Sequence, residues 1–287
     1  MTRWVEERLH RDFRIALKAD KVLYEDETAH QHLVLFENET FGRVLALDDV
    51  IQTTERDEFI YHEMLTHVPI LAHGAVRRVL IVGGGDGGML EEALKHPGVE
   101  RVTLVEIDPG VIEFSRRYLG SICRDAFDDP RLELVIADGV EYVAETQARF
   151  DLAIVDSTDP IGPGEVLFTE RFYAGCKRVL APGGILVTQN GVVFLQDEEL
   201  RTTLGLLRPR FAEATCYLAS VPSYVGGPMA FGWATDETAH RRTPLATLRE
   251  RFAAAGIATR YYTPEVHQGA FALPGYVQAA MAPRGGG

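Results

Sequence analysis

From residue 78 onward, short apolar runs alternate with segments of helical periodicity, and this alternation restricts the possible folds more than any other feature of the chain. The apolar runs read RVLIV, RVTLVEID, LELVIADG, FDLAIVDSTDP and GGILVTQN, and patterns such as MLEEALKH and VIEFSRRYL separate them. Strands that are apolar nearly throughout are buried on both faces, so they belong to a parallel sheet covered by helices on each side. The sequence thus predicts an α/β fold with a doubly wound, mostly parallel, Rossmann-like sheet.

The preceding residues follow a different pattern. Up to Thr54, short runs such as HLVLFEN and RVLALDD are separated by closely spaced turn signals, which predicts a small antiparallel β-sheet. A helix is expected to begin with Thr54 as its N-cap and Asp57 in a capping-box position, and to end near Pro69. We therefore expect an N-terminal β domain with a linking helix in residues 1–73 and a Rossmann-like domain in residues 74–287.

Charge and composition restrict the class of function. The 287 residues carry a net charge of −13, which argues against nucleic-acid binding as the main activity, because such binding depends on Lys and Arg. No segment has the pattern of a signal peptide or a membrane span, so we expect a cytoplasmic protein without a membrane partner. The three cysteines, and His62 and His67 five positions apart, match no metal-binding pattern, so no metal site is expected.

The loop GGGDGG follows the first apolar strand and opens a helix, which is the context in which a glycine-rich turn binds a nucleotide. Glu106 ends the next strand about twenty residues later, where a carboxylate can accept hydrogen bonds from both ribose hydroxyls of an adenosine. Asp138 ends the third strand and can accept a hydrogen bond from an adenine amino group, although an Asp before Gly139 also fits a simple turn. Together these residues predict an adenosine pocket.

Asp86 lies inside the glycine loop and indicates which adenosine ligand fits. A dinucleotide would place its pyrophosphate there, and a carboxylate repels phosphates, which argues against NAD. S-adenosylmethionine has a sulfonium but also a carboxylate, whereas its decarboxylated form ends in a bare ammonium. Charge alone therefore favours decarboxylated S-adenosylmethionine, which would be a co-substrate, and no other cofactor is expected.

Four blocks of the sequence, LIVGGGDGGMLEEALKH, VEIDPGVIEFSRRYL, DSTDPIGPGEVLF and YHEM, carry a more specific signal. They resemble the signature blocks of the spermidine synthases, the polyamine aminopropyltransferases, of bacterial type, and the resemblance runs from HQHLVLFEN to RYYTPEVHQGAFALP. It implies a methyltransferase-type Rossmann domain beside a small β domain. It also implies transfer of the aminopropyl group of decarboxylated S-adenosylmethionine to putrescine, giving spermidine and 5′-methylthioadenosine, by a homodimer or homotetramer.

The resemblance further implies roles for single positions. The adenosine part of the donor would be held by Gln31, Gln52, Glu106, Asp138, Gly139 and Pro163. Asp86 would hold the aminopropyl ammonium, and Asp156 would be the proton acceptor. The diamine would be bound by Tyr61, His62, Asp86, Asp156, Ser157, Thr158, Asp159 and Tyr224. Some members carry Gln at the position of His62, an Arg is common at the position of Glu91, and no role is predicted for His267.

The chemistry of the reaction explains why two acids follow the strand that ends in DSTDPIGP, although these residue types alone would also fit an ordinary turn. An alkylammonium has a pKa of about 10.4, so the attacking amine must first lose a proton. Asp156 suits this proton transfer, and Asp159 suits binding of a dication. The acceptor stays open among putrescine, cadaverine, agmatine and spermidine, because one methylene changes binding by only about 1–3 kcal/mol.

Three other functions compete with this interpretation. A diamine methyltransferase would use the same scaffold with intact S-adenosylmethionine, but Asp86 would then face the methionine carboxylate. A polyamine-binding regulator would not need an adenosine pocket, and a nicotinamide dehydrogenase would need room for a pyrophosphate at Asp86.

Overall fold

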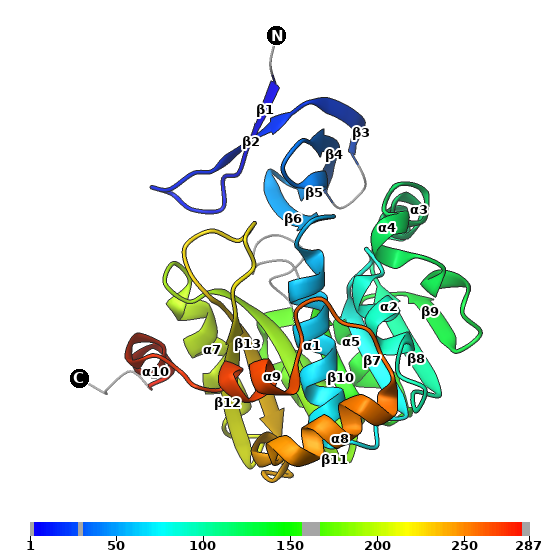
Figure 1. The fold of residues 1–287 in the computed structure, drawn as a ribbon, viewed down its shortest axis with the longest axis vertical. Helices are drawn as coiled ribbons and strands as arrows, with labels where there is room; N and C mark the ends of the chain where they lie inside the picture. The colour runs from blue at the N-terminus through cyan, green and yellow to red at the C-terminus, as the bar shows by residue number, and fades with distance from the viewer. Residues whose placement is uncertain (1–2, 28–30, 157–166, 283–287) are drawn as a thin grey trace.

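The computed structural model describes residues 3–27, 31–156 and 167–282, and it places a small β part on a larger α/β part (Figure 1). In the larger part, seven of the described strands form one sheet in the order β12-β13-β11-β10-β7-β8-β9. Their bounds are β7 (Arg78–Gly83), β8 (Arg101–Glu106), β9 (Leu132–Ile136), β10 (Phe150–Asp156), β11 (Leu180–Val192), β12 (Glu213–Ala219) and β13 (Met229–Thr235). β11, β10, β7, β8 and β9 pair in parallel, whereas β13 pairs antiparallel with both β11 and β12, so the predicted mostly parallel sheet is confirmed.

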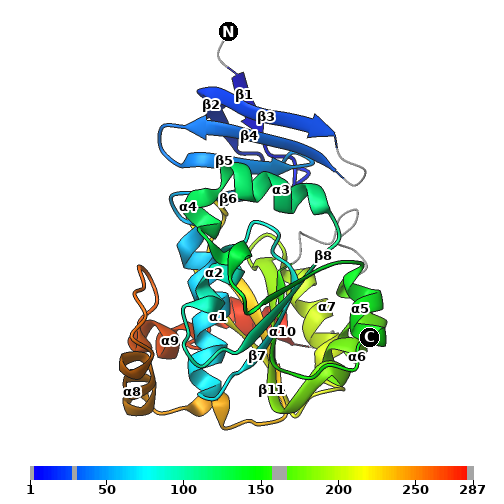
Figure 2. The same ribbon diagram turned by 90° about the vertical axis from the view of Figure 1, so that its right-hand side faces the viewer.

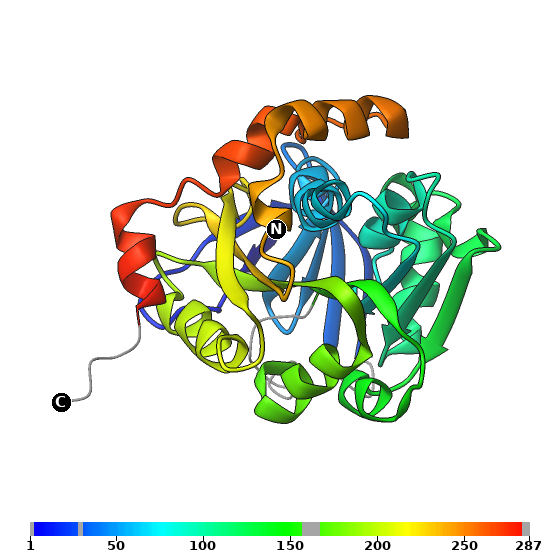
Figure 3. The same cartoon turned by 90° about the horizontal axis from the view of Figure 1, so that it is seen from below.

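Helices cover both faces of this sheet, because each strand directs alternate side chains to opposite faces (Figure 3). Val79 and Ile81 of β7 lie in a core shared with α1 (Glu58–His73), α2 (Gly88–Leu94), α8 (Leu245–Ala255) and α9 (Pro264–Ala270). Leu80 and Val82 lie in the core of the other face, shared with α5 (Gly139–Glu145), α6 (Glu170–Val179), α7 (Asp197–Leu207) and α10 (Gly275–Met281). Both cores are made almost entirely of aliphatic and aromatic side chains, so the sheet is rigid enough to position groups at its ends.

The small β part has an antiparallel sheet of β3 (Lys21–Glu27), β4 (His32–Asn38), β5 (Gly42–Leu47) and β6 (Val50–Thr54), as the turn spacing predicts. The strands β1 (Arg3–Glu6) and β2 (Ala16–Ala19) add a hairpin that the turn spacing did not predict. One face of the four-stranded sheet packs on α3 (Pro109–Tyr118) and α4 (Gly120–Cys123), which lie between the two parts (Figure 2). This shared core fixes the β part over the carboxyl ends of the parallel strands.

The predicted start and end of the first helix are wrong. Thr54 is the last residue of β6, and its hydroxyl donates to Asp57 Oδ1 at 2.6 Å. Asp57 is the N-cap, but its second oxygen accepts from the backbone N–H of Ser223 at 2.6 Å and it forms no capping bond. The helix continues through Pro69 to His73 because it is held by burial on nearly every side. It ends at Gly74, which has a φ of 78° that favours glycine.

None of the described helices combines the length and the apolar character needed to cross a bilayer.

α1 runs alongside the sheet, from the β part down to the opposite end of the molecule (Figure 1). Its first turns therefore face the carboxyl ends of β7, β8 and β10, where a ligand would bind in an open α/β sheet.

Candidate active site

A pocket lies between the four-stranded sheet and the carboxyl ends of the parallel strands. It is lined by eight of the residues proposed for the site from the sequence: Gln31, Gln52, Tyr61, His62, Asp86, Glu106, Asp156 and Tyr224. These residues come from both parts of the molecule, so the pocket requires the β part to be in place.

Two other predicted residues that the structure describes lie outside this lining. Asp138 and Gly139 do not line the pocket; Asp138 is the N-cap of α5 and accepts from the backbone N–H of Val140 at 2.7 Å. A Cβ on Gly139 would lie 2.5 Å from Val82 Cγ1, so the backbone there packs directly on β7. Ser157, Thr158, Asp159 and Pro163 fall outside the described residues.

The glycine loop turns sharply between β7 and α2 because several of its residues adopt a left-handed conformation. Gly83, Gly84 and Gly87 have φ values of 83°, 70° and 80°. Gly85 brings the backbone against the carboxylate of Glu106, since a Cβ there would lie 2.7 Å from Glu106 Oε2. A larger residue at Gly85 would therefore displace Glu106, and one at Gly83, Gly84 or Gly87 would strain the turn.

Glu106 ends β8 with only 8 % of its surface exposed. Burial raises its pKa, and this effect is opposed by backbone N–H donors, one of which is Asp108 N at 3.0 Å from Oε1. The carboxylate thus has a fixed orientation at the pocket wall. Such a group can accept hydrogen bonds from vicinal hydroxyls, as expected for an acid at the end of the second strand.

Asp156 ends β10, the strand next to β7, and its carboxylate lies close to the glycine loop. Oδ1 accepts a hydrogen bond from the hydroxyl of Tyr61 at 2.5 Å, and a Cβ on Gly84 would lie 3.0 Å from Oδ2. Burial, and next the negative charge of Asp86, raise the pKa of Asp156 to about 7. Burial beside the same carboxylates raises the pKa of Tyr61 well above its usual value, so the phenol stays a donor. A carboxylate with a pKa near neutrality is suited to proton transfer.

His62 lies between two carboxylates one turn into α1. Its Nδ1 is 2.7 Å from Glu58 Oε2, and its Nε2 is 3.3 Å from Asp86 Oδ2. Burial alone would lower the pKa of His62, but Asp86 and Glu58 raise it well above its usual value. Burial would raise the pKa of Asp86, but the His62 charge and the backbone N–H of Gly88 hold it below its usual value. His62 and Asp86 therefore form an ion pair in the pocket lining.

The donor atoms of His62, Asp86 and Asp156 lie within 4.8 Å of one another, which is the one described group of this kind that a metal ion could bridge. The hydrogen-bond pattern argues for a proton in its place. A metal ligand nitrogen must have a free lone pair, whereas His62 Nε2 faces a carboxylate as a donor.

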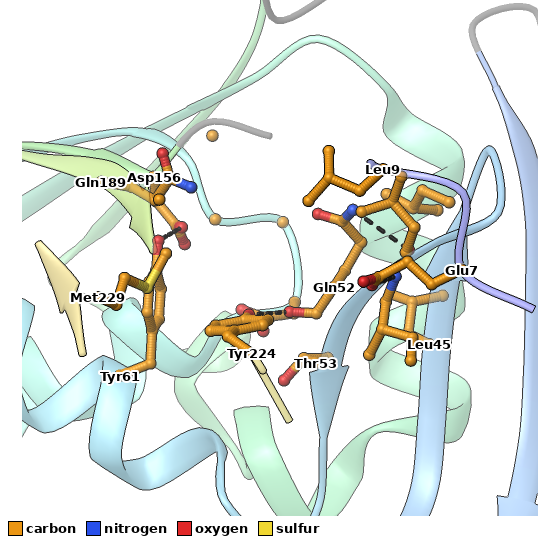
Figure 4. Close-up of a pocket in the computed structure, with 18 of the residues that line it drawn as sticks. Glu7, Leu9, Leu45, Gln52, Thr53, Tyr61, Asp156, Gln189, Tyr224 and Met229 are labelled. Atoms are coloured by element: carbon orange, nitrogen blue, oxygen red, sulfur yellow. Dashed lines mark hydrogen bonds between the residues drawn. The ribbon is translucent and has the colours of Figure 1, made fainter. Parts of the chain in front are cut away.

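The opposite end of the pocket also contains a carboxylate, which was not predicted from the sequence. Figure 4 shows Asp156, Tyr61 and Gln189 at one end, Tyr224 in the middle, and Gln52, Leu9 and Glu7 at the other end. Tyr224 donates its hydroxyl to the backbone oxygen of Gln52, and Glu7 Oε2 accepts from the backbone N–H of Ile51 at 3.0 Å. The pocket is thus an elongated channel with an acid at each end.

Other lining residues that were not predicted include Leu9, His10, Gln189, Gln196, Val225 and Met229. Gln189 lies toward the carboxyl end of β11, so the rule that placed Asp156 in the site could have found it. Nothing in the local sequence marks Glu7, because its position depends on how the N-terminal segment folds over β6.

Three further histidines and Glu91 lie outside the pocket lining and make contacts within the fold. His267 Nδ1 is 2.9 Å from the hydroxyl of Tyr262, and burial lowers the pKa of His267 to about 3. His67 Nδ1 is 2.9 Å from His96 Nε2 within the core between α1 and α2. Glu91 pairs with Lys95 at 2.8 Å and does not line the pocket.

Two family models match the chain. Residues 58–243 match the model described as the spermine/spermidine synthase domain, and residues 3–55 match the one described as the spermidine synthase tetramerisation domain. Curated relatives include the polyamine aminopropyltransferase of Ruegeria sp. (strain TM1040), 60% identical over 96% of this chain and 97% of the relative. Polyamine aminopropyltransferase 1 of Pseudomonas aeruginosa is 59% identical over 96% of each chain.

Solved structures of similar proteins agree with these matches. A spermidine synthase crystallised in complex with the transition state analogue AdoDATO superposes with a TM-score of 0.92 at 37% identity, covering 98% of this chain and 96% of the other. The spermidine synthase from Thermotoga maritima superposes with a TM-score of 0.88 at 35% identity, covering 98% of this chain and 95% of the other.

Proposed function

The chain belongs to the spermine/spermidine synthase family and is a polyamine aminopropyltransferase, and we propose that it transfers the aminopropyl group of decarboxylated S-adenosylmethionine to putrescine with Asp156 as the proton acceptor. The observation that best supports these roles is the pairing of Asp86, in the glycine loop, with Asp156 at the end of the adjacent strand. Two carboxylates that close together suit a donor and an acceptor that are both cations.

For the donor, we assign the ribose to Glu106 and the aminopropyl ammonium to Asp86. Gly85 lets the chain approach Glu106 closely, which leaves room for a nucleoside against the loop. Gln31 and Gln52 line the same pocket and would contact the adenosine part. Asp138 and Gly139, which do not line the pocket, and Pro163 are assigned to the adenosine part on the family resemblance alone. The donor is consumed as a co-substrate rather than retained as a cofactor.

For the acceptor, the channel in Figure 4 suggests an orientation. One ammonium of putrescine would lie at Asp156 and the other near Glu7, with its methylenes against Tyr61 and Tyr224. Asp159, Ser157 and Thr158 would complete the near end of the channel.

In the transfer step, the free amine attacks the aminopropyl carbon next to the sulfonium, the carbon–sulfur bond breaks, and methylthioadenosine leaves. Asp156 accepts the proton lost by the nitrogen, and Tyr61 holds the carboxylate in place through its 2.5 Å hydrogen bond. The site aligns amine and carbon, which supplies much of the acceleration.

We also propose that the protein is a homo-oligomer, a dimer or a tetramer, assembled through its N-terminal β part. The match of residues 3–55 to a tetramerisation domain supports this, as does the exposure of Trp4 and Phe13 in that part.

The decisive experiment is a mass-spectrometric product assay with putrescine and, in parallel, S-adenosylmethionine or its decarboxylated form. We expect spermidine and methylthioadenosine with the decarboxylated donor only. Methylated putrescine from the intact donor would instead indicate a methyltransferase. Asp156→Asn should lower turnover by roughly 10²–10⁴-fold, the usual contribution of a general base, and unchanged turnover would remove Asp156 from the mechanism.

A further inference from the structure

His62 is enclosed by negative charge from two different elements. Glu58, one turn before it in α1, contacts Nδ1 at 2.7 Å, and Asp86, from the loop between β7 and α2, contacts Nε2 at 3.3 Å. The ring has 2 % of its side-chain surface exposed, and a Cβ on Gly88 would lie 2.2 Å from its Cε1. The ring is therefore clamped, and it cannot turn to present a different edge.

The two contacts determine the protonation state of His62. A carboxylate can only accept a hydrogen bond, so both ring nitrogens must donate, and this requires an imidazolium. Among the described residues, other ionisable groups near it include Asp156 from β10, Tyr61 from α1, and Arg260, whose Nη1 lies 3.9 Å from Glu58 Oε1. Burial would lower the pKa of His62, but the charges of Asp86 and Glu58 raise it well above its usual value, in agreement with the contacts.

This arrangement conflicts with the role proposed for Asp86. The ammonium of the donor must approach the same carboxylate that His62 already neutralises, and the sulfonium brings a second positive charge close by. Two cations sharing one buried carboxylate repel each other strongly, because the interior screens charge poorly. Loss of the His62 proton would remove this repulsion and leave Nε2 able to accept a hydrogen bond from the ammonium.

We propose that His62 is the counter-ion of Asp86 in the free enzyme, oriented by Glu58, and that it releases its Nε2 proton to solvent when the ammonium of the aminopropyl donor binds. This inference rests on the donor-binding role proposed above. Nδ1–H continues to donate to Glu58, and Nε2 then offers a lone pair to the incoming ammonium beside Asp86. Glu58 is thus a positioning residue, which selects the tautomer that can accept from the substrate.

The test is titration calorimetry of the intact enzyme with decarboxylated S-adenosylmethionine, in buffers that differ in ionisation enthalpy. Near pH 7 we expect His62 to release about one proton per site, and any further fraction to come from Asp156. Binding of the demethylated donor, which keeps the ammonium but has no sulfonium, should also cause the enzyme to release a proton. Binding of methylthioadenosine, which has no ammonium, should not. Equal release with methylthioadenosine, or donor binding without release, would overturn the inference while leaving the proposed function intact. Absence of donor binding would refute both.

Variants identify the group that loses the proton. The His62→Gln variant should bind the donor with little proton release. The Asp156→Asn variant should release most of the protons that the unchanged enzyme releases. The reverse result would assign the proton to Asp156 and overturn the inference. His32→Gln is the matched control, because His32 also faces a carboxylate, Glu25 at 3.6 Å, but lies outside the pocket.

A spectroscopic measurement on the unchanged protein covers the case in which the variants fail to fold. The ¹⁵N shifts of the His62 ring should show two protonated nitrogens in the free enzyme and a single one, Nδ1, in the donor complex. Glu58→Gln should retain the tautomer, because its amide oxygen still accepts from Nδ1, but should lower the number of protons released. A neutral ring in the free enzyme would overturn the inference.

Discussion

Replacement of Asp156 by Asn should stabilise the ligand-free protein while impairing turnover. The Asp156 carboxylate lies beside the carboxylate of Asp86 at the pocket floor, and burial followed by this charge raises its pKa from 3.8 to about 7. Folding therefore places an acid where its ionised form is disfavoured. Asn has the same shape without the charge, and its amide oxygen can still accept from Tyr61.

The magnitude follows from the pKa difference between the folded and the unfolded chain. Because the folded-state pKa is raised, the folded protein binds more protons than the unfolded chain between about pH 4 and pH 7, and stability falls as pH rises through this window. A difference of about three pKa units means that Asp156 lowers the free energy of unfolding by about 4 kcal/mol above pH 7, and by only about 1.5 kcal/mol near pH 5, relative to an uncharged side chain of the same shape. The advantage of Asp156→Asn should thus grow with pH and level off above about pH 7.

Thermal or urea unfolding of both proteins, without ligand, at about pH 5 and about pH 8 measures this difference. Asp12→Asn is the matched control, since the Asp12 side chain is 91% exposed and its replacement should change stability little at either pH. If Asp156→Asn were less stable than the unchanged protein at the higher pH, or if its advantage did not depend on pH, burial would not disfavour the carboxylate and the reasoning would be wrong.

Three further predictions concern pH, the far end of the channel and assembly. kcat/KM should rise with pH through about 7, because Asp156 must be ionised to accept a proton, and a flat profile there would exclude it as the base. Glu7→Gln should raise the KM for putrescine about 10–100-fold, the loss expected for a charge-assisted hydrogen bond, with the donor KM unchanged; Glu6→Gln, on the exposed side, is the control. Trp4→Ser should reduce the oligomer mass in light scattering, whereas Phe194→Ser, at a residue that is more exposed than Trp4 but lies outside residues 3–55, should not; identical masses would place the interface elsewhere.

The elements of the large sheet could be predicted because burial on both faces leaves a direct trace in the sequence. β7 and β10 have unbroken apolar runs, VLIV and LAIV, and the structure shows them paired inside the sheet with a neighbouring strand on each side. The start of α1 could not be predicted, because Asp57 is committed to the distant backbone of Ser223 rather than to its own helix. Tertiary contacts of this kind override local capping signals.

The same distinction applies to the site. Asp86, Glu106 and Asp156 each lie at or just after the end of a strand of the parallel sheet, so the rule that ligands bind at carboxyl ends is enough to identify them in the sequence. Glu58 and Glu7 carry no such mark. Glu58 looks like an ordinary acidic residue in a first helical turn, four positions before His62. Only the packing of α1 against the glycine loop brings Asp86 to the other nitrogen of that ring and so gives the Glu58 contact a place in the site.

The described part of the site offsets the negative charge of its buried carboxylates in two ways. Its ligands are cations, so it needs carboxylates, but in the free enzyme those carboxylates are buried without their ligands. Asp86 is neutralised by a protonated His62, and Asp156 is neutralised in part by holding its own proton beside Tyr61. Cationic ligands displace protons in both cases, so the affinities for donor and diamine should increase as the pH rises toward the pKa values of the two groups. Affinities that were independent of pH in this range would mean that the ligands bind without contacting either carboxylate.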